Sequence, residues 1–397
     1  MTRVTGSVAA TIAGAVLGAA LTLSLTSPAR QVEVEVPDAP RSPIVGEAPI
    51  QTLLAWSPGG LPPGYASAVR ELEEVRSAVA VRSGVAWLSA WRDREGVVRT
   101  PPRGLSIPIE IAAANIDAYL AFVPPVDRTE FAALSEGGAV MGRTGAAIRG
   151  VGPGGSLRFG STSLTVRAVV DDEFIGAHEV LVSIRTGEDL DILVPRYLLV
   201  SPRPEVRARA VEASLRRVLP ASTRLRVRAP GETPVFRHGD AVLPPVRLKE
   251  LFGEFAGAPR SDGTIGADPS WVRTNIRRVR LPILGSAACH RLLLPQLRAA
   301  LQELARRGLG DLLDRGDFGG CFFPRFANLN PLSGISHHSW GVAVDLNVSQ
   351  NPLGGEPRLD RRVVEVFERW GFTWGGRWLL PDPMHLEFLR FPLATKG

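Results

Sequence analysis

The sequence is poor in lysine and cysteine. Lys249 and Lys396 are the only lysines among 397 residues, so arginine carries nearly all of the positive charge behind the formal net charge of +6. The arginines form no basic stripe with interleaved aromatic residues, which a nucleic-acid groove would require, and we expect no nucleic-acid partner. No Cys-x-x-Cys pair is present, which argues against a cysteine-based zinc site.

Long apolar runs are also scarce, and the N-terminus carries the exception. Residues Val8 to Leu25 are apolar and rich in small side chains, and they follow the basic Arg3. The length of this run lies between that of a signal-peptide core and that of a minimal membrane span, and no clear Ala-x-Ala cleavage site follows it. We expect a signal anchor over residues 1–27 that holds the rest of the chain outside the cytoplasm at the membrane, with a cleaved signal peptide and secretion as the alternative.

The two cysteines, Cys289 and Cys321, fit such an oxidising compartment. In an exported protein, two cysteines within one domain most simply form a disulfide. Closing a loop of about 30 residues would stabilise the fold by roughly 3 to 4 kcal/mol in the chain-entropy description. Free buried thiols are the alternative.

The length of the chain exceeds that of one ordinary core and favours two folded domains. Proline-rich composition indicates linkers, and alternating apolar residues between glycine turns indicate strands. We therefore predict an α+β protein that consists of the membrane segment, a linker over 28–63, an α+β domain over 64–230, a linker over 231–264 and a C-terminal domain over 265–397.

Apolar spacing places several elements within these domains. A period near 3.6 residues predicts helices, and a period of two predicts strands. The predicted helices are Ala66 to Val79, Glu205 to Val218, Leu293 to Arg307 and Arg361 to Trp370, and the predicted strands are Val85 to Trp91, Tyr197 to Val200, Leu225 to Val227, Val342 to Leu346 and Met384 to Phe388.

The residues suited to chemistry are concentrated in two short stretches of the C-terminal domain, 336–345 and 382–387. Together they hold three of the six histidines. A hydrolytic zinc ion takes about three protein ligands from His, Asp and Glu and keeps one position open. His338, Asp345 and His385 supply such a set, whereas the neighbouring His337 is the less favoured ligand.

The spacing of these ligands requires a bend in the chain. A helix would place His338 and Asp345 about 10.5 Å apart along its axis, too far for one ion. Gly341 offers the bend, and the strands on either side of the site then put Asp345 and His385 on adjacent strands. Asp382 lies at the mouth of the second strand, where a general base is needed, and Glu387 is placed to orient His385.

The combined pattern resembles a known family. Ser336-x-His338-x-x-Gly341-x-Ala343-x-Asp345, followed by Trp374-Gly375-Gly376-x-Trp378 and Asp382-x-Met384-His385-x-Glu387, resembles the peptidase M15 family of zinc peptidoglycan peptidases over roughly residues 265 to 392. That family includes D-Ala-D-Ala carboxypeptidases of the VanY type and L-alanyl-D-glutamate endopeptidases.

The resemblance implies zinc on His338, Asp345 and His385, and Asp382 as general base. It further implies that Arg325 steadies the substrate carbonyl and that Ser336 contacts the substrate. The fold implied is a small antiparallel sheet with packed helices, and the substrate is peptidoglycan. The last motif is Asp-x-x-His rather than the Glu-x-x-His usual in VanY-type and VanX-type enzymes, which favours an endopeptidase over the alternative carboxypeptidase.

The domain over 64–230 carries no catalytic motif, and its glycine-rich strands faintly resemble the extracytoplasmic domain of MacB/FtsX-type permeases. This resemblance suggests a cell-envelope protein partner. A rival interpretation of the whole chain is a non-catalytic cell-wall binding or regulatory module. The complete ligand set together with Asp382 favours the enzyme.

Overall fold

The computed structural model describes residues 52–220, 222–229, 238–240 and 243–392. All of them belong to one compact unit, 43–397. Within the described ranges, no helix is both long enough and apolar enough to span a bilayer. The expected signal anchor, residues 1–27, lies outside the described residues, as does most of the linker predicted over 28–63.

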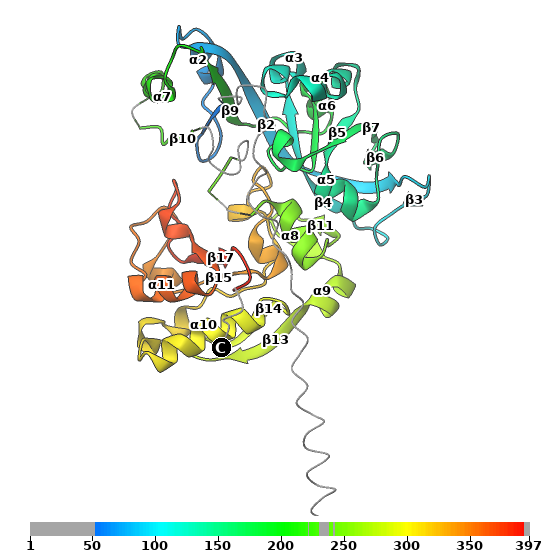
Figure 1. The fold of residues 1–397 in the computed structure, drawn as a ribbon. Coiled ribbons are helices and arrows are strands. Elements are labelled where there is room, and N and C mark those ends of the chain that lie inside the picture. Colours follow the sequence, from blue (N-terminus) through cyan, green and yellow to red (C-terminus); the bar gives the residue numbers. More distant parts are fainter. Residues whose placement is uncertain (1–51, 221, 230–237, 241–242, 393–397) are drawn as a thin grey trace, which may run out of the picture. The chain divides into compact units, whose positions relative to one another are not determined.

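Within this one unit, we call the part from β1 to β10 the first domain and the part from α8 to β17 the second domain. The first domain is built on one large mixed sheet (Figure 1). The order of its main strands is β10-β1-β9-β2-β4-β8-β5-β7-β6, and β3 pairs with β2. Its strands are β1 (Leu53–Trp56), β2 (Val75–Arg92), β3 (Val98–Arg99), β4 (Ile107–Ala114), β5 (Ala139–Gly142), β6 (Ser156–Phe159), β7 (Thr162–Val170), β8 (Val180–Ser183), β9 (Pro195–Pro202) and β10 (Arg226–Arg228).

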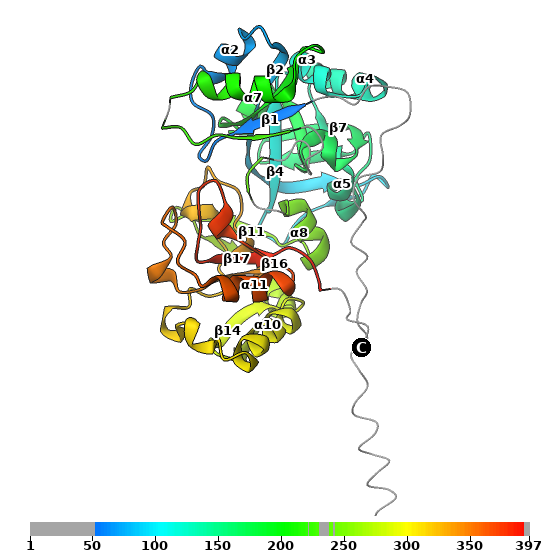
Figure 2. The same cartoon turned by 60° about the vertical axis from the view of Figure 1, so that its left-hand side comes forward.

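Strand β2 organises this sheet because it is 18 residues long and pairs along different parts of its length with β9, β4 and β6. The additional pairing of β2 with β6 closes a ring through β4, β8, β5 and β7. The helices of the domain are α2 (Tyr65–Arg70), α3 (Ile116–Tyr119), α4 (Arg128–Ala132), α5 (Arg143–Arg149), α6 (Ile184–Asp189) and α7 (Ala208–Arg217). In Figure 2, α2 and α7 lie side by side, and the Tyr65 hydroxyl donates to the Leu215 carbonyl.

The helix predicted over Ala66 to Val79 is wrong beyond its first two turns. Helix α2 ends at Arg70, and Val75 and Val79 belong to β2, which also contains the predicted strand Val85 to Trp91. The apolar spacing fits a helix locally, but pairing with β9 gives the second half of this segment a buried place in the sheet. The predictions for the later part of the domain are confirmed by β9, α7 and β10, within a few residues at each end.

The second domain combines helices with small sheets. Its helices are α8 (Pro245–Phe252), α9 (Pro269–Asn275), α10 (Leu294–Arg306) and α11 (Arg361–Arg369). Two-stranded sheets join β11 (Gly257–Pro259) to β12 (Ile265–Ala267) and β13 (Ile276–Leu281) to β14 (Gly285–His290). The third sheet is antiparallel in the order β15-β17-β16, with β15 (Ala343–Asp345), β17 (His385–Phe388) and β16 (Phe372–Trp374).

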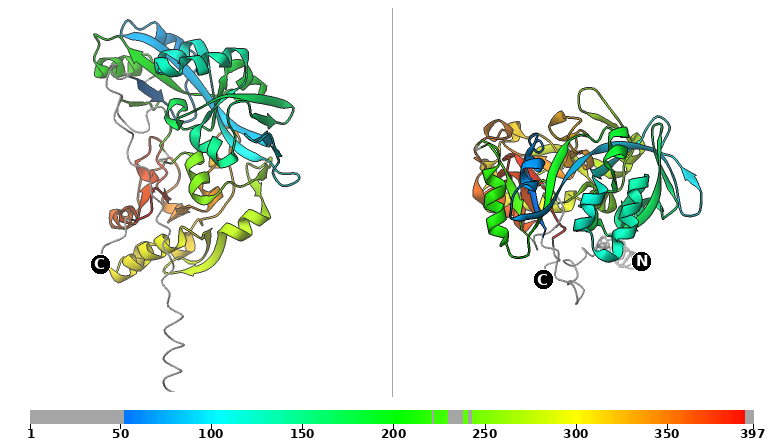
Figure 3. Two further views of the ribbon diagram at one scale, coloured as in Figure 1. Left: turned by 45° about the vertical axis from the view of Figure 1, so that its right-hand side comes forward. Right: turned by 90° about the horizontal axis from the view of Figure 1, so that it is seen from above.

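Helices α10 and α11 confirm the sequence prediction, because each buries the apolar side that its spacing defines. Leu297, Leu301 and Leu304 of α10 are fully buried, and so are Val363 and Phe367 of α11. The two helices lie together in Figure 3. Arg369 of α11 pairs with Glu303 of α10 at 2.5 Å. This packing supports the face of the sheet that carries the strands of the candidate site.

The predicted linkers contain ordered elements. Strand β1 falls within 28–63, and α8 with β11 falls within 231–264. Helix α8 forms there because Pro245, Leu248 and Phe252 recur at intervals of three and four residues and are buried. The prolines that suggested a linker, Pro244 and Pro245, instead stand at the start of the helix, where a missing N–H is tolerated.

Candidate metal centre

Three side chains of the second domain lie close enough to share one ion. His338 Nε2 is 3.1 Å from Asp345 Oδ2 and 3.3 Å from His385 Nδ1. His385 Nδ1 is in turn 3.0 Å from the other carboxylate oxygen of Asp345, Oδ1. All three residues are buried. Donor atoms bound at about 2.1 Å to a tetrahedral ion are about 3.4 Å apart, so the three donors fit zinc.

The local fold delivers these ligands from two strands and one turn. Asp345 on β15 is directly opposite His385 on β17 in the antiparallel register. His338 belongs to a short 3-10 turn, His337–Trp340, that ends at Gly341 in the left-handed conformation, with φ 68°. A Cβ at Gly341 would lie 2.9 Å from the His290 backbone nitrogen, so the bend requires glycine.

A second layer of groups orients the two imidazoles. His338 Nδ1 donates to the carbonyl oxygen of Cys321 at 2.9 Å, and the disulfide between Cys321 and Cys289 ties that segment to β14. His385 Nε2 lies 3.2 Å from Glu387 Oε2. Such contacts fix which ring nitrogen faces a metal. His337 Nδ1 lies 2.7 Å from the same Glu387 oxygen, so His337 stands behind the ligand set and not in it.

The centre favours positive charge because buried carboxylates lie against both imidazoles. Although burial opposes the ionised form of Asp345, its contacts with His338 and His385 hold the pKa of this carboxyl well below its usual range. Burial likewise disfavours a charged His385, yet hydrogen bonds with Asp345 and Glu387 raise its pKa to about 10. A divalent cation can replace these protons, since metal binding requires deprotonated ligands.

Asp382 precedes β17 and stands apart from the three ligands. Its Oδ1 atom is buried and has no hydrogen-bond partner in the part of the chain that the structure describes. Burial raises the pKa of this carboxyl. Its backbone approaches Gly375 so closely that a Cβ there would lie 2.6 Å from the Asp382 carbonyl oxygen. A buried, unpaired carboxylate oxygen points to a further polar partner at the site, such as water or substrate.

Arg325 and Ser336 reach the edge of the same centre. The Arg325 guanidinium is largely buried, and its Nη2 lies 4.0 Å from Asp345 Oδ2. The Arg325 carbonyl accepts from the Ser336 backbone N–H at 3.0 Å, which joins the two segments. The Ser336 hydroxyl accepts from the His338 N–H at 3.4 Å and so caps the ligand turn; its contact with substrate stays a prediction.

Sequence reasoning missed two supports of this centre. The Cys321 carbonyl acts through its backbone, which no residue pattern can indicate. Trp340 is fully buried, and its Nε1 donates to the Gly253 carbonyl at the end of α8. The apolar spacing of residues 245–252 could have indicated helix α8, and the Gly253 carbonyl that receives the Trp340 donor lies at the end of that helix.

The comparison with protein families adds independent evidence. Residues 331–388 match the peptidase M15 family, by the model described as D-alanyl-D-alanine carboxypeptidase. The M15 match confirms the resemblance predicted from the motifs, and it supports a peptidase. It contains all three candidate ligands and Asp382, whereas Arg325 precedes it. No curated protein matches the chain.

Two solved structures are similar to the chain in part. The periplasmic region of MacB from Actinobacillus actinomycetemcomitans has 13% identity and a TM-score of 0.32, covering 45% of this chain and 88% of that one. The extracellular domain of the noncanonic ABC-type transporter YknZ from Gram-positive bacteria has 13% identity and a TM-score of 0.30, covering 45% and 98%. They agree with the second resemblance, but at these scores they carry no functional argument.

Proposed function

We propose that the second domain is a zinc-dependent peptidase that hydrolyses the stem peptides of peptidoglycan. The observation that carries this proposal is the closeness of the three candidate ligands, whose nearest donor atoms are 3.0 to 3.3 Å apart, beside the unpartnered oxygen of Asp382. His338, Asp345 and His385 would hold the zinc ion. The ion would supply Lewis acidity, which lowers the pKa of water and polarises a carbonyl group.

The residues around the ligands have separate tasks in this proposal. Asp382 takes the proton from the attacking water, and its raised pKa suits that task because the carboxyl then accepts a proton more readily near neutral pH. Arg325 donates to the substrate oxygen as negative charge develops on it. Glu387 and the Cys321 carbonyl keep the ligand nitrogens turned towards the ion.

Two specificities within this reaction are in competition. The Asp-x-x-His form of the last motif favours an endopeptidase of the L-alanyl-D-glutamate type. The matched family model carries the description D-alanyl-D-alanine carboxypeptidase, which favours that activity as the second candidate. The two differ in product, because only a carboxypeptidase of this kind releases free D-alanine.

The location and partners of the protein follow as further parts of the proposal. A peptidoglycan substrate requires the domain to work outside the cytoplasm, which agrees with the signal anchor expected over 1–27. The first domain would then contact a cell-envelope protein or position the peptidase at the membrane.

The deciding experiment is digestion of purified peptidoglycan by the full chain, with mass spectrometry of the products. Asp382→Asn is the matched control, because it removes the base but keeps the shape. Its zinc content, measured by inductively coupled plasma mass spectrometry, should equal that of the unmodified protein. Cleavage between L-Ala and D-Glu supports the endopeptidase, and release of D-alanine supports the carboxypeptidase. A zinc-bound protein without any Asp382-dependent product would favour the non-catalytic binding module.

A further inference from the structure

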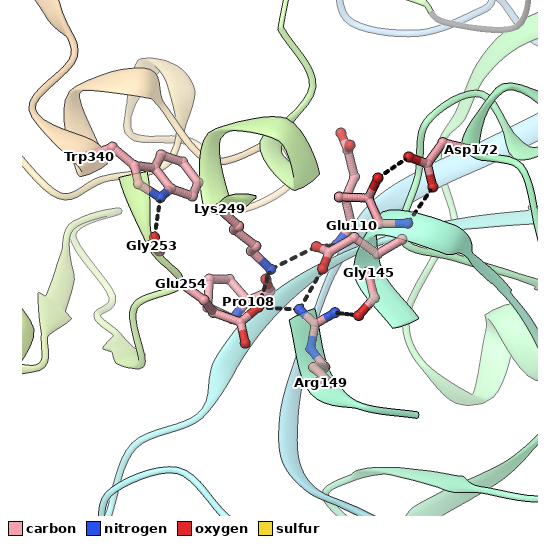
Figure 4. Close-up of polar contacts among 11 residues, drawn as sticks. Pro108, Glu110, Gly145, Arg149, Asp172, Lys249, Gly253, Glu254 and Trp340 are labelled. Atoms are coloured by element: carbon pink, nitrogen blue, oxygen red, sulfur yellow. Dashed lines mark hydrogen bonds and ion pairs between the residues drawn. The ribbon is translucent and has the colours of Figure 1, made fainter. Parts of the chain in front are cut away.

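A cluster of four charged side chains is buried away from the metal centre. It consists of Arg149, Glu179, Lys249 and Glu254 (Figure 4). The side chains of Arg149 and Lys249 are 1% exposed, that of Glu179 is fully buried and that of Glu254 is 13% exposed. Charges this deeply buried are tolerated only when each is paired, and removal of one partner strongly destabilises the rest.

Lys249 is the centre of this cluster. Its ammonium group donates hydrogen bonds to the Pro108 carbonyl at 2.5 Å and to Glu179 Oε1 at 2.7 Å, and it forms an ion pair with Glu254 Oε1 at 3.2 Å. Arg149 completes the cluster by donating to Glu179 Oε2 at 2.5 Å and to Glu254. The lysine therefore contacts both carboxylates of the cluster and a backbone carbonyl of β4.

The cluster joins the two domains. Pro108 lies on β4, Arg149 ends α5 and Glu179 precedes β8, so all three belong to the first domain. Lys249 lies on α8, and Glu254 follows that helix. The position of α8 is consequently set by the first domain through buried, directional contacts.

The C-terminal end of α8 also contacts the turn that carries His338. The Gly253 carbonyl accepts from Trp340 Nε1 at 3.1 Å, as drawn in Figure 4. The preceding carbonyl, that of Phe252, accepts from His290 Nε2 at 3.1 Å, and the His290 backbone N–H donates to the Gly341 carbonyl at 2.9 Å. The last turn of α8 thus supports both Trp340 and Gly341, which separate the first two candidate ligands in the sequence.

We propose that Lys249 is a positioning residue for the metal centre. Through Glu179 and Arg149, the first domain holds α8, and α8 holds the Trp340–Gly341 bend that brings His338 to Asp345. The inference rests on the proposed function in so far as it concerns a zinc site. It assigns the first domain a part in forming that site, beyond any contact with other proteins.

The test is Lys249→Met, which keeps an unbranched side chain, one atom shorter, and removes its charge. Hydrogen exchange of the peptide covering 336–346 is measured in the metal-free protein, and zinc affinity is measured by chelator competition. We expect faster exchange in this peptide and zinc binding weaker by about tenfold, the lower end of the range for loss of a supporting contact. The matched control is Leu215→Ala, which opens a cavity in the first domain between α7 and its sheet, in a core cluster that includes no residue of α8.

A double-mutant cycle separates positioning from general loss of stability. Trp340→Phe removes the Nε1 donor and keeps an aromatic ring. If Lys249 acts through the Gly253 to Trp340 contact, the effects of Lys249→Met and Trp340→Phe on zinc affinity are not additive. Additive effects, or equal changes in Leu215→Ala, would overturn the proposal.

Two further outcomes are distinguishable. If Lys249→Met does not fold, Glu179→Gln replaces it, because it removes one charge and keeps the volume, and the same exchange and affinity changes are expected. If the unmodified protein binds no zinc, the proposed function fails, while the exchange of residues 336–346 in the metal-free protein still decides whether Lys249 holds the turn. Unchanged exchange in both folded variants would overturn the inference.

Discussion

Asp345 and His385 are direct neighbours across β15 and β17, and Asp345 Oδ1 lies 3.0 Å from His385 Nδ1. Two residues 40 positions apart in the sequence therefore present adjacent donor atoms from two hydrogen-bonded strands. Of the three candidate ligands, only His338 comes from a turn.

Glu387→Gln should weaken zinc binding by about 10-fold to 100-fold, the usual cost of losing a group that orients a metal ligand. The carboxylate of Glu387 lies 3.2 Å from His385 Nε2 and 2.7 Å from His337 Nδ1, and the uncharged amide is a poorer acceptor for both. Competition with a chelator at neutral pH gives the affinity. Glu365→Gln, on the exposed side of α11, is the control and should leave it unchanged. Equal affinities in Glu387→Gln and the unmodified protein would contradict the role given to Glu387.

Arg325→Lys should lower kcat by about 100-fold while zinc content is retained. The guanidinium presents several fixed donors to a developing oxyanion, whereas an ammonium group is a compact point charge. Steady-state kinetics on a stem-peptide substrate measure the effect. Arg377→Lys serves as the control, because Arg377 pairs with Glu368 and is largely exposed. A loss confined to KM would show that Arg325 only binds the ground state.

Stability should fall between about pH 6.5 and pH 4 because of His290. Burial lowers the pKa of this imidazole to about 4, so the folded state keeps it neutral, whereas the unfolded chain takes up a proton below about pH 6.5. Lowering the pH through this window therefore favours unfolding, by up to about 3 kcal/mol. Thermal unfolding of the unmodified protein and of His290→Gln, from pH 7 to pH 4, measures the difference. Parallel pH dependence in the two proteins would contradict the prediction.

Gly341→Ala should destabilise the protein more than Gly308→Ala does. Both glycines have nearly the same left-handed backbone, φ 68° and 66°, so each substitution costs about 1 to 2 kcal/mol in conformational strain. Only at Gly341 does the new Cβ meet close atoms, the His290 nitrogen at 2.9 Å and Ile276 Cδ1 at 3.1 Å. Chemical denaturation gives the free energies of unfolding. We also expect weaker zinc binding for Gly341→Ala but not for Gly308→Ala. An equal loss of stability in the two variants would show that the atoms around Gly341 move aside without a loss of free energy.

Much of the candidate site could be predicted because its signals are local. His338, Gly341 and Asp345 lie within eight positions of one another, and the alternation of Met384 to Phe388 places His385 and Glu387 on one face of a strand. The need for a bend at Gly341 follows from the distance between ligands of one ion. Helices α10 and α11 were equally predictable, because their apolar spacing agrees with the side that the fold buries.

Other features depended on contacts between distant segments. Val75 and Val79 fit a helix by spacing, but pairing of this part of β2 with β9 made that segment a strand. Lys249 stood out in the sequence only as a rare lysine in a stretch predicted as a linker. Its acceptors lie 141 and 70 positions away, at Pro108 and Glu179. The sequence by itself determined which residues can bind a metal and where the chain must bend, because these follow from side-chain chemistry and backbone sterics. Only the tertiary structure decided which buried charges hold α8 against the ligand turn, because pairing between residues far apart in the sequence produces no periodic sequence pattern.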